Sequence, residues 1–260
     1  MGFNRPCTNH LHIITQIVPA VVSYQSDPGF RGGTLLLPSL VPGSADAIQA
    51  LTVRALNLAG VMTANVVSLG AEPVALGDLT FSGYLRAVDG PSLFCRSVFD
   101  RMARQANPDR RRHSPRAIFV SRVDSKDRVM RNEYELIARL LRWGIEPVEL
   151  SSLDLDEQIA LFRDTRLVVG AHGAGLANIV FCQPGTVLYE LLPAHYVNPC
   201  VAHLAQMRDV HYWCDVHRSD DLPGVWRHRA SWTVEIDAVG RRIAEIMARY
   251  DLACDVPALA

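Results

Sequence analysis

The chain has 260 residues, 49% of them hydrophobic and 20% charged, and its 26 basic and 27 acidic residues give a net charge of −1. This composition supplies a sizeable apolar core and excludes a mainly disordered chain. The balanced charge excludes nonspecific electrostatic binding of nucleic acid by the chain as a whole. No apolar run reaches the roughly 20 residues of a membrane span. The first ten residues lack the basic-then-apolar order of a secretory signal, and the six cysteines form no C-x-x-C pair. We therefore expect a cytoplasmic protein with reduced thiols and no zinc site.

The first part of the chain shows an irregular alternation of helix and strand signals. Helices are expected over His10–Tyr24, Ala45–Leu58 and Cys95–Gln105, and strands over Thr34–Leu37 and Asn65–Leu69. This pattern predicts a small α/β lobe that is short or incomplete. The polar, proline-containing segment Asn107–Pro115 is the linker candidate, so we expect a first domain at 1–108 and a second at 109–260.

The second part alternates regularly between apolar strands and amphipathic helices. The expected strands are Ala117–Val120, Pro147–Leu150, Leu167–Gly170, Thr186–Leu192 and His211–Val216. The expected helices are Tyr134–Leu141, one that starts at a capping box of Asp154 and Glu157, Gly173–Phe181, Asn198–Met207 and Val239–Tyr250. This order predicts a parallel sheet with helices on both faces and a ligand site beyond the carboxyl ends of its strands.

A glycine-rich turn follows the third of these strands, in the segment LVVGAHGAGLAN from Leu167 to Asn178. Small residues let the backbone approach a ligand, and the free N–H groups at a helix start favour an anion. The imidazole of His172 lies at this turn, where it can donate a hydrogen bond to a phosphate. The alternative is an ordinary tight turn between a strand and a helix. The glycine register differs from the G-x-G-x-x-G pattern of dinucleotide-binding proteins.

A basic segment, SRVDSKDRVMRNE, follows the first strand of the second part and places four cations over ten residues. Arginine donates two parallel hydrogen bonds to a phosphate, so Arg122 and Arg128 are candidates for binding a diphosphate. The alternative is a solvated basic loop, with Asn132 and Glu133 capping the next helix. Glu190 lies in an apolar strand and needs a partner there. A ribose diol is one candidate, and a place at the solvent edge of the strand is the alternative.

Several separated motifs stand in an order and spacing that resemble one family. These are Ser121-Arg122, Arg128, Asn132-Glu133, Glu157-Gln158, His172-Gly173-Ala174-Gly175-Leu176 with Asn178, Pro184-Gly185 and Glu190. Together they resemble glycosyltransferase family 61, over about Arg116–Leu192. The earlier segment Asn9–Val21 resembles that family in His12 and Pro19, but Ile13, Gln16 and Ala20 depart from its pattern.

The resemblance implies an α/β fold of the GT-B type, with two Rossmann-like lobes, the first an acceptor-side lobe and the second a donor-binding lobe. It implies inverting transfer of a sugar from a nucleotide-sugar donor, UDP-linked, to a glycan or polysaccharide acceptor, without a cofactor or metal. The assigned diphosphate ligands are Arg122, Arg128, His172, Gly173, Ala174, Gly175 and Leu176. The assigned nucleotide ligands are Asn132, Asn178 and Glu190. His12 is the candidate general base, because histidine titrates near neutral pH and the resemblance places a histidine there.

Three rival classes remain open. The chain could bind a nucleotide or glycan without turnover, which the departures at Gln16 and Ala20 favour. It could be an NAD-type oxidoreductase, against which the glycine register argues. It could also be a structural partner of another transferase. Nucleotide binding separates the last class from the others, and release of nucleoside diphosphate on adding acceptor separates an enzyme from a binder.

Overall fold

A computed structural model describes residues 9–26, 35–38, 45–61, 66–69, 75, 77, 92–107, 115–220 and 230–252. Its largest part is a five-stranded sheet in the order β4-β3-β5-β6-β7, and every neighbouring pair is parallel. The strands are β3 (Ala117–Val120), β4 (Glu146–Val148), β5 (Leu167–Ala171), β6 (Val187–Pro193) and β7 (His211–His217). The expected parallel sheet is confirmed, with one difference: a short 3₁₀ turn, η5 (Leu150–Ser152), begins where the second expected strand was to end.

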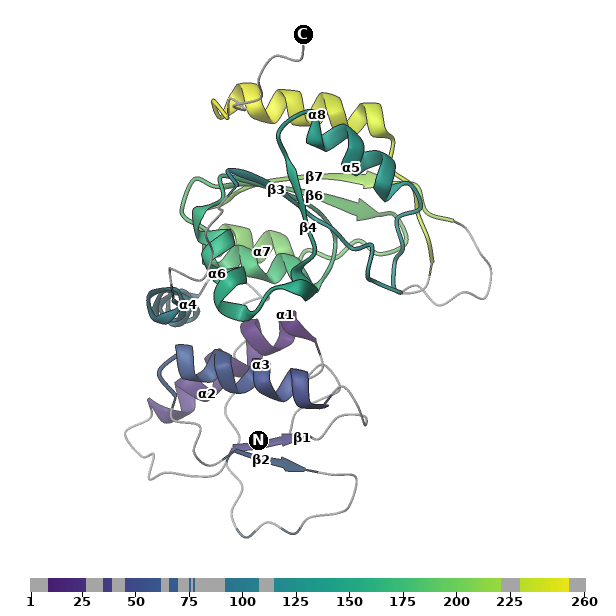
Figure 1. The fold of residues 1–260 in the computed structure, drawn as a ribbon. Helices are drawn as coiled ribbons and strands as arrows, with labels where there is room; N and C mark the ends of the chain where they lie inside the picture. Colours follow the sequence, from purple (N-terminus) through teal and green to yellow (C-terminus); the bar gives the residue numbers. More distant parts are fainter. Residues whose placement is uncertain are drawn as a thin grey trace.

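Helices cover both faces of this sheet, as Figure 1 shows. Helices α5 (Glu133–Leu141) and α8 (Ile236–Arg249) lie on one face. Helices α6 (Leu155–Asp164), η6 (Ala174–Phe181) and α7 (Cys200–Met207) lie on the other. Side chains alternate along a strand, so Phe119 packs towards α5 and α8, whereas its neighbours Ile118 and Val120 join the cluster on the opposite face. The long apolar runs of the sequence are thus the strands buried on both faces.

The order of the strands has a switch point between β3 and β5. On one side of it the chain adds β4, and on the other side it adds β5, β6 and β7. The chain goes from β3 outward to β4, then returns past β3 to form β5, β6 and β7 in turn. In open parallel sheets, ligands bind in the crevice at this switch point, beyond the carboxyl ends of the strands. The segments that leave those two ends carry Arg122 after β3 and His172 after β5.

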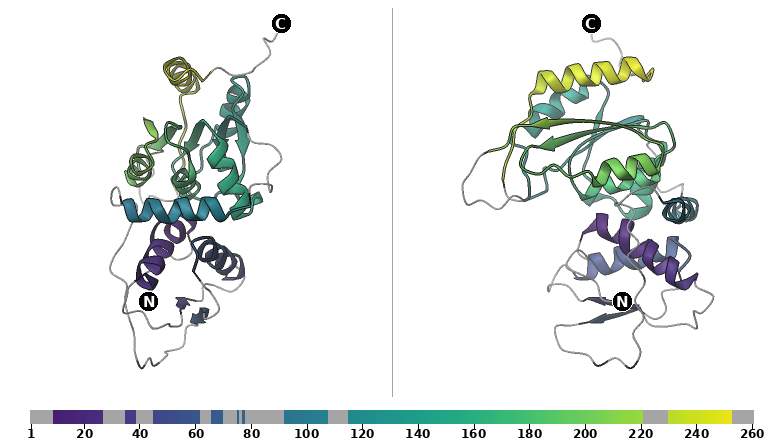
Figure 2. Two further views of the ribbon diagram at one scale, coloured as in Figure 1. Left: turned by 90° about the vertical axis from the view of Figure 1, so that its left-hand side faces the viewer. Right: turned by 180° about the vertical axis from the view of Figure 1, so that it is seen from behind.

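The first part of the chain forms a smaller layer below the sheet in Figure 1. One helical rod contains α1 (His10–His12), the π-helical segment η2 (Ile13–Ile17) and α2 (Val18–Gln25). The other elements of this layer are α3 (Ala45–Leu58) and the parallel pair of strands β1 (Leu35–Pro38) and β2 (Val66–Leu69). Helix α4 (Leu93–Gln105) follows them in the chain. Turned by 90°, the molecule shows α4 lying crosswise between this layer and the sheet domain (Figure 2).

The two parts share one apolar core. Buried residues of η2 and α4, such as Ile14 and Phe99, belong to the same cluster as Phe162 of α6 and Phe181 of η6. An ion pair adds a polar link, since Arg54 Nε of α3 donates to Asp156 Oδ2 of α6 at 2.7 Å. The predicted domain boundary at 108/109 lies just outside the described residues.

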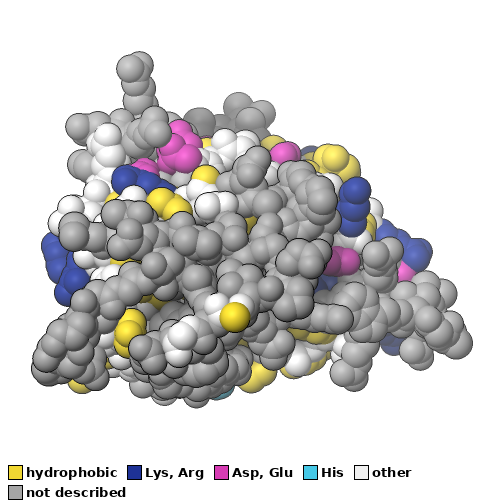
Figure 3. Space-filling view, turned by 90° about the horizontal axis from the view of Figure 1, so that it is seen from below, with side chains coloured by type: hydrophobic (Ala, Val, Ile, Leu, Met, Phe, Trp, Pro, Cys, Tyr) yellow, Lys and Arg dark blue, Asp and Glu magenta, His cyan; other side chains and the backbone are white. Residues whose placement is uncertain are grey.

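Two features of the described residues concern the expected absence of a membrane span and of nucleic-acid binding: the lengths of the helices and the distribution of basic side chains. Of the helices that the structure describes, none combines the length and apolarity needed to cross a membrane. Seen from below, the described basic side chains stand at the margins of the view, in separate groups (Figure 3).

Candidate functional site

The carboxyl ends of β3 and β5 border a cavity of about 270 Å³. Its walls come from the loop after β3, the start of η5 and the glycine turn before η6; they include Ser121, Arg122, Leu150, Gly173 and Gly175. This volume lies near the lower end of the range for ligand pockets, about 300 Å³. The cavity therefore lies at the switch point of the sheet and is bordered by both segments that the sequence singled out.

Arg122 is held in place above the glycine turn. Its Nη2 donates to Ser125 Oγ at 2.8 Å and to the Asp127 carbonyl oxygen at 2.9 Å. A Cβ atom at Gly173 would overlap Nη1 of Arg122 and lie 2.9 Å from its Cζ. The backbone at Gly173 is extended, with φ −179°, which any residue can adopt. Glycine is therefore needed there for space, because a larger side chain would displace the guanidinium of Arg122. Burial and the nearby charge of Arg128 lower the pKa of Arg122 to about 10.

Glu133, at the start of α5, fixes the loop that carries Arg122. Its Oε1 accepts hydrogen bonds from Ser121 Oγ at 2.9 Å and from the Arg122 backbone N–H at 2.6 Å. Burial raises the pKa of this carboxyl group. The alternative of a simple helix cap is wrong for Asn132, whose side chain makes no capping hydrogen bond.

Asn132, which is expected at the donor nucleotide, makes two hydrogen bonds within the protein. Its Nδ2 donates to the Val234 carbonyl oxygen at 2.9 Å, and its Oδ1 accepts from the Val234 N–H at 3.1 Å. Both ends of the amide are thus used to hold the segment before α8 against the start of α5.

His172 belongs to a buried relay of three side chains. His172 Nδ1 lies 2.6 Å from Glu190 Oε1, and the Tyr212 hydroxyl donates to Glu190 Oε2 at 2.6 Å. Burial, followed by the charge of Glu190, raises the pKa of the Tyr212 hydroxyl, so it stays a donor. Glu190 is fully buried and both of its oxygens are engaged, so the expected direct contact with a ribose does not fit this geometry. Its carboxylate instead fixes the orientation of the His172 ring.

The Tyr196 ring lies between the basic segment and the glycine turn, and it contacts Arg128 and His172. The Arg128 guanidinium lies over the Tyr196 ring, with its Cζ 4.8 Å from the ring centroid. The His172 ring lies 5.4 Å from the same Tyr196 ring, centroid to centroid. Arg128 adopts a left-handed backbone, with φ 52°, and its carbonyl oxygen accepts from Trp232 Nε1 at 2.8 Å. The structure therefore brings Arg122, Arg128 and His172 together, as the sequence predicts for a shared edge of the sheet.

Asn178 joins the two parts of the chain. Gln158 Nε2 donates to the carbonyl oxygens of Leu150 and Leu153, so Gln158 Oε1 is free to accept from Asn178 Nδ2, at 2.8 Å. Asn178 Oδ1 must then accept the 2.9 Å hydrogen bond from His10 Nε2, which fixes the tautomer of that histidine. Burial lowers the pKa of His10. Asn178 is fully buried and so engaged, which does not fit the expected contact with a nucleotide.

Three further expected site residues have these positions. The Leu176 N–H donates to the Gly173 carbonyl oxygen at 3.1 Å and its side chain is fully buried, so this N–H is already engaged. Ala174 begins η6 and directly follows Gly173, which borders the guanidinium of Arg122. His12 ends α1, the short helix that His10 ties to Asn178, and its role as a base stays a prediction.

Sequence reasoning missed His10, Tyr196 and Tyr212 as members of this site. A weak signal could have indicated Tyr212. Strand β7 pairs with β6 and places Cys214 opposite Glu190, and Tyr212 lies two residues from Cys214, on the same face of the sheet. Within the described ranges, no group of three His, Cys, Asp or Glu side chains is placed to hold a metal ion.

The family model of Glycosyltransferase 61 matches residues 11–189. This range runs from α1 into β6 and includes the arginine loop, the cavity and the glycine turn. The chain belongs to glycosyltransferase family 61. The match also extends the family resemblance back through the first part of the chain, as far as residue 11.

Individual relatives match shorter stretches. An EGF domain-specific O-linked N-acetylglucosamine transferase of Drosophila melanogaster is 33% identical over 100 residues, which cover 37% of this chain and 19% of the relative. A beta-1,2-xylosyltransferase of Arabidopsis thaliana is 27% identical over 110 residues, covering 42% of this chain and 18% of the relative. The chain thus spans less than a fifth of the length of these relatives.

Proposed function

We propose that this family 61 protein transfers a sugar from a UDP-linked donor to a hydroxyl group of a glycan or polysaccharide, with inversion at the anomeric carbon. The observation that carries the proposal is the meeting of Arg122, Arg128 and His172 at the switch point of the parallel sheet. Transferase names of two matching relatives support the reaction class. The acceptor hydroxyl attacks the anomeric carbon, and the bond to the nucleoside diphosphate breaks on the opposite side.

The leaving diphosphate needs positive charge and hydrogen-bond donors, because negative charge grows on it as the sugar departs. We assign this role to Arg122, Arg128 and the N–H groups of Gly173, Ala174 and Gly175. The charge of Arg128 disfavours the charged form of Arg122 in the unliganded site, as the lowered pKa of Arg122 indicates. A bound diphosphate relieves this repulsion, since each guanidinium gains an oppositely charged partner.

His172 has a fixed orientation in this proposal. Its Nδ1–H donates to Glu190, so its Nε2 is the atom left to act on the ligand. A proton on Nε2 lets the ring donate to a phosphate oxygen. Glu190 and Tyr212 are then positioning residues that act through His172.

The acceptor side is assigned to the first part of the chain. A base must take the proton of the attacking hydroxyl, and His12 remains our candidate. His10 ties α1 to η6 through Asn178, so a hydrogen bond between the two parts holds the segment that carries His12. A second candidate function, binding without turnover, is favoured by Gln16 and Ala20, which depart from the family pattern.

Arg128→Ala provides the central test of donor binding. Removing a charge-assisted contact of about 1.5–3 kcal/mol should weaken UDP binding roughly tenfold to a hundredfold. Arg128→Lys should restore only part of the affinity, because an ammonium group cannot make two parallel hydrogen bonds. Titration calorimetry with UDP, after a thermal-shift screen of nucleotides and nucleotide sugars, measures both variants.

Arg131→Ala is the matched control, since it removes the same charge from the same loop. Arg131 pairs with Asp220, at 2.5 Å, and should contribute little to UDP affinity. Unchanged affinity in folded Arg128→Ala would overturn the diphosphate assignment. Release of UDP from a UDP-sugar that depends on an added glycan would separate transfer from binding alone.

A further inference from the structure

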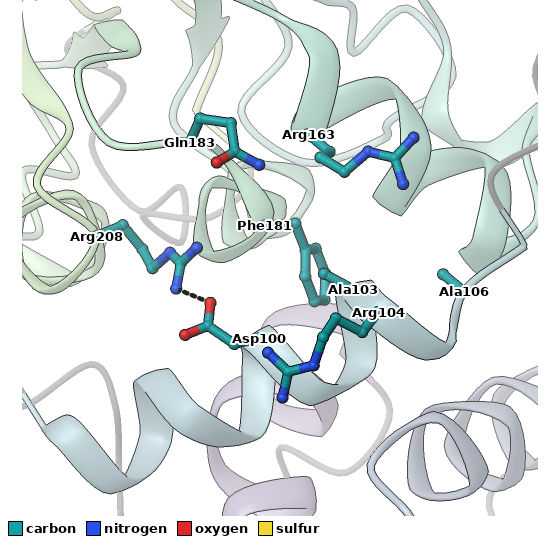
Figure 4. Close-up of a pocket in the computed structure, with 8 residues that line it drawn as sticks. All are labelled: Asp100, Ala103, Arg104, Ala106, Arg163, Phe181, Gln183 and Arg208. Carbon is teal, nitrogen blue, oxygen red and sulfur yellow. Dashed lines mark hydrogen bonds and ion pairs between the residues drawn. The ribbon is translucent and has the colours of Figure 1, made fainter.

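A second cavity, of about 330 Å³, lies at the opposite end of η6 from the glycine turn. Figure 4 shows its lining: Asp100, Ala103 and Arg104 of α4, Ala106 just after it, Arg163 of α6, Phe181 and Gln183 at the end of η6, and Arg208 after α7. The eight residues of η6 span about 16 Å at the 3₁₀ rise of roughly 2 Å per residue. The cavity is therefore separate from the candidate donor site.

The lining carries three guanidinium groups and one carboxylate. Arg208 is buried and uses Nη1 to donate to Asp100 Oδ1 at 2.6 Å, and Nη2 to donate to the Cys182 carbonyl oxygen at 3.1 Å. Its Nε is buried without a hydrogen-bond partner among the described residues. Arg208 thus has a fixed position at the wall of the cavity, held by Asp100 and by the Cys182 carbonyl oxygen.

The other two arginines come from different parts of the chain. Arg163 donates Nε to the adjacent Asp164 at 3.0 Å, an exposed contact between sequence neighbours. Arg104 is exposed and makes no hydrogen bond or ion pair with any residue that the structure describes. The Gln183 amide lies between Arg163 and Arg208 in the view of Figure 4, above the buried ring of Phe181.

We propose that this cavity is a second anion site that binds an oxyanion, a phosphate or a carboxylate group, between α4 and α6. Arg104 and Arg163 supply the charged donors, Gln183 supplies a neutral donor, and the pair of Arg208 with Asp100 forms the floor. Arg104 belongs to the first part of the chain and Arg163 to the sheet domain. A bound oxyanion thus links the two parts and stabilises the folded protein by mass action.

The test uses inorganic phosphate and glucuronate as probes, because they distinguish a phosphate source from the carboxylate of an acidic sugar. Each is titrated by calorimetry at constant ionic strength into Arg122→Ala protein, which removes a contact of the proposed donor site. Saturable binding of one probe is expected, and the stronger one identifies the source. Arg104→Ala and Arg163→Ala, each added to that background, should weaken it about tenfold or more.

Arg241→Ala is the control, since Arg241 is an exposed arginine of α8, a helix on the other face of the sheet. It should leave probe affinity unchanged. At equal probe concentration, the probe should also raise the melting temperature of the control more than that of Arg104→Ala, because the weaker-binding variant is less saturated. Absence of saturable binding of both probes, or equal affinity in Arg104→Ala and the control, would overturn the site.

Discussion

Gly173→Ala tests the role of the Arg122 guanidinium, because it should displace this group and change the stability of the fold only slightly. The backbone at 173 is extended, so alanine meets no conformational strain there. Its methyl group must instead displace the guanidinium of Arg122, because Nη1 occupies that space. The displaced group loses its 2.8 Å and 2.9 Å hydrogen bonds to Ser125 and Asp127, worth about 1 kcal/mol each at most in a partly exposed loop.

The effect on UDP binding should be larger than the effect on stability. Loss of a placed, charged donor costs about 1.5–3 kcal/mol in binding, which is roughly a tenfold to hundredfold loss of affinity. Calorimetry with UDP gives the affinity, and urea unfolding gives the stability. Gly240→Ala is the control: an added Cβ meets only Arg139 Nε, at 3.9 Å, inside helix α8. It should leave binding unchanged and raise stability by about 0.5–1 kcal/mol. Full UDP affinity in folded Gly173→Ala would refute the role given to Arg122.

Three further predictions concern the buried polar groups. Glu190→Gln should lower transfer several-fold and shift its pH profile, whereas Tyr212→Phe should act more weakly; an unchanged profile in Glu190→Gln would contradict the relay. Burial lowers the pKa of His10 and of His217 in the folded protein. Just below pH 6.5 the unfolded chain therefore binds more protons than the folded protein, and the free energy of unfolding should fall as the pH drops from about 6.5. Urea unfolding at several pH values checks this, and His10→Gln should reduce the slope without abolishing it; an undiminished slope would count against His10. Finally, partial burial and the charge of Glu190 raise the pKa of Cys200 to about 11. Iodoacetamide at pH 8 should therefore label exposed Cys214 faster than Cys200, as mass spectrometry would show, and equal rates for these two would argue against this environment of Cys200.

The sheet domain was largely predictable because its signals are local. Apolar runs marked β3, β5 and β6, and the predicted capping box of Asp154 and Glu157 is present with both of its hydrogen bonds. The rule that parallel strands share a carboxyl edge brought Arg122 and His172 together without any tertiary information. These predictions needed only spacing of a few residues and the known geometry of parallel sheets.

The roles of buried polar residues were not predictable in the same way. Asn178 bonds to His10 across 168 positions of sequence, and no local pattern encodes that pairing. Glu190 was rightly expected to need a partner, but the sequence did not show that β7 brings Tyr212 beside it. A helix cap is one alternative that the sequence offers for Glu133, at the start of α5, but its carboxylate accepts hydrogen bonds from the loop after β3.

The apolar core shared by the two parts of the chain limits how this protein can move. Opening a hinge between them would expose large side chains such as Phe99 and Phe181, whose rings now meet edge to face at 6.2 Å between centroids. Each such exposure costs about 1.5–3 kcal/mol, so wide rotation of the two parts as rigid bodies is disfavoured. In the proposed reaction, the donor and acceptor would then enter the site without a wide opening of the two parts. The shared core would also make the two parts unfold together, as one cooperative unit.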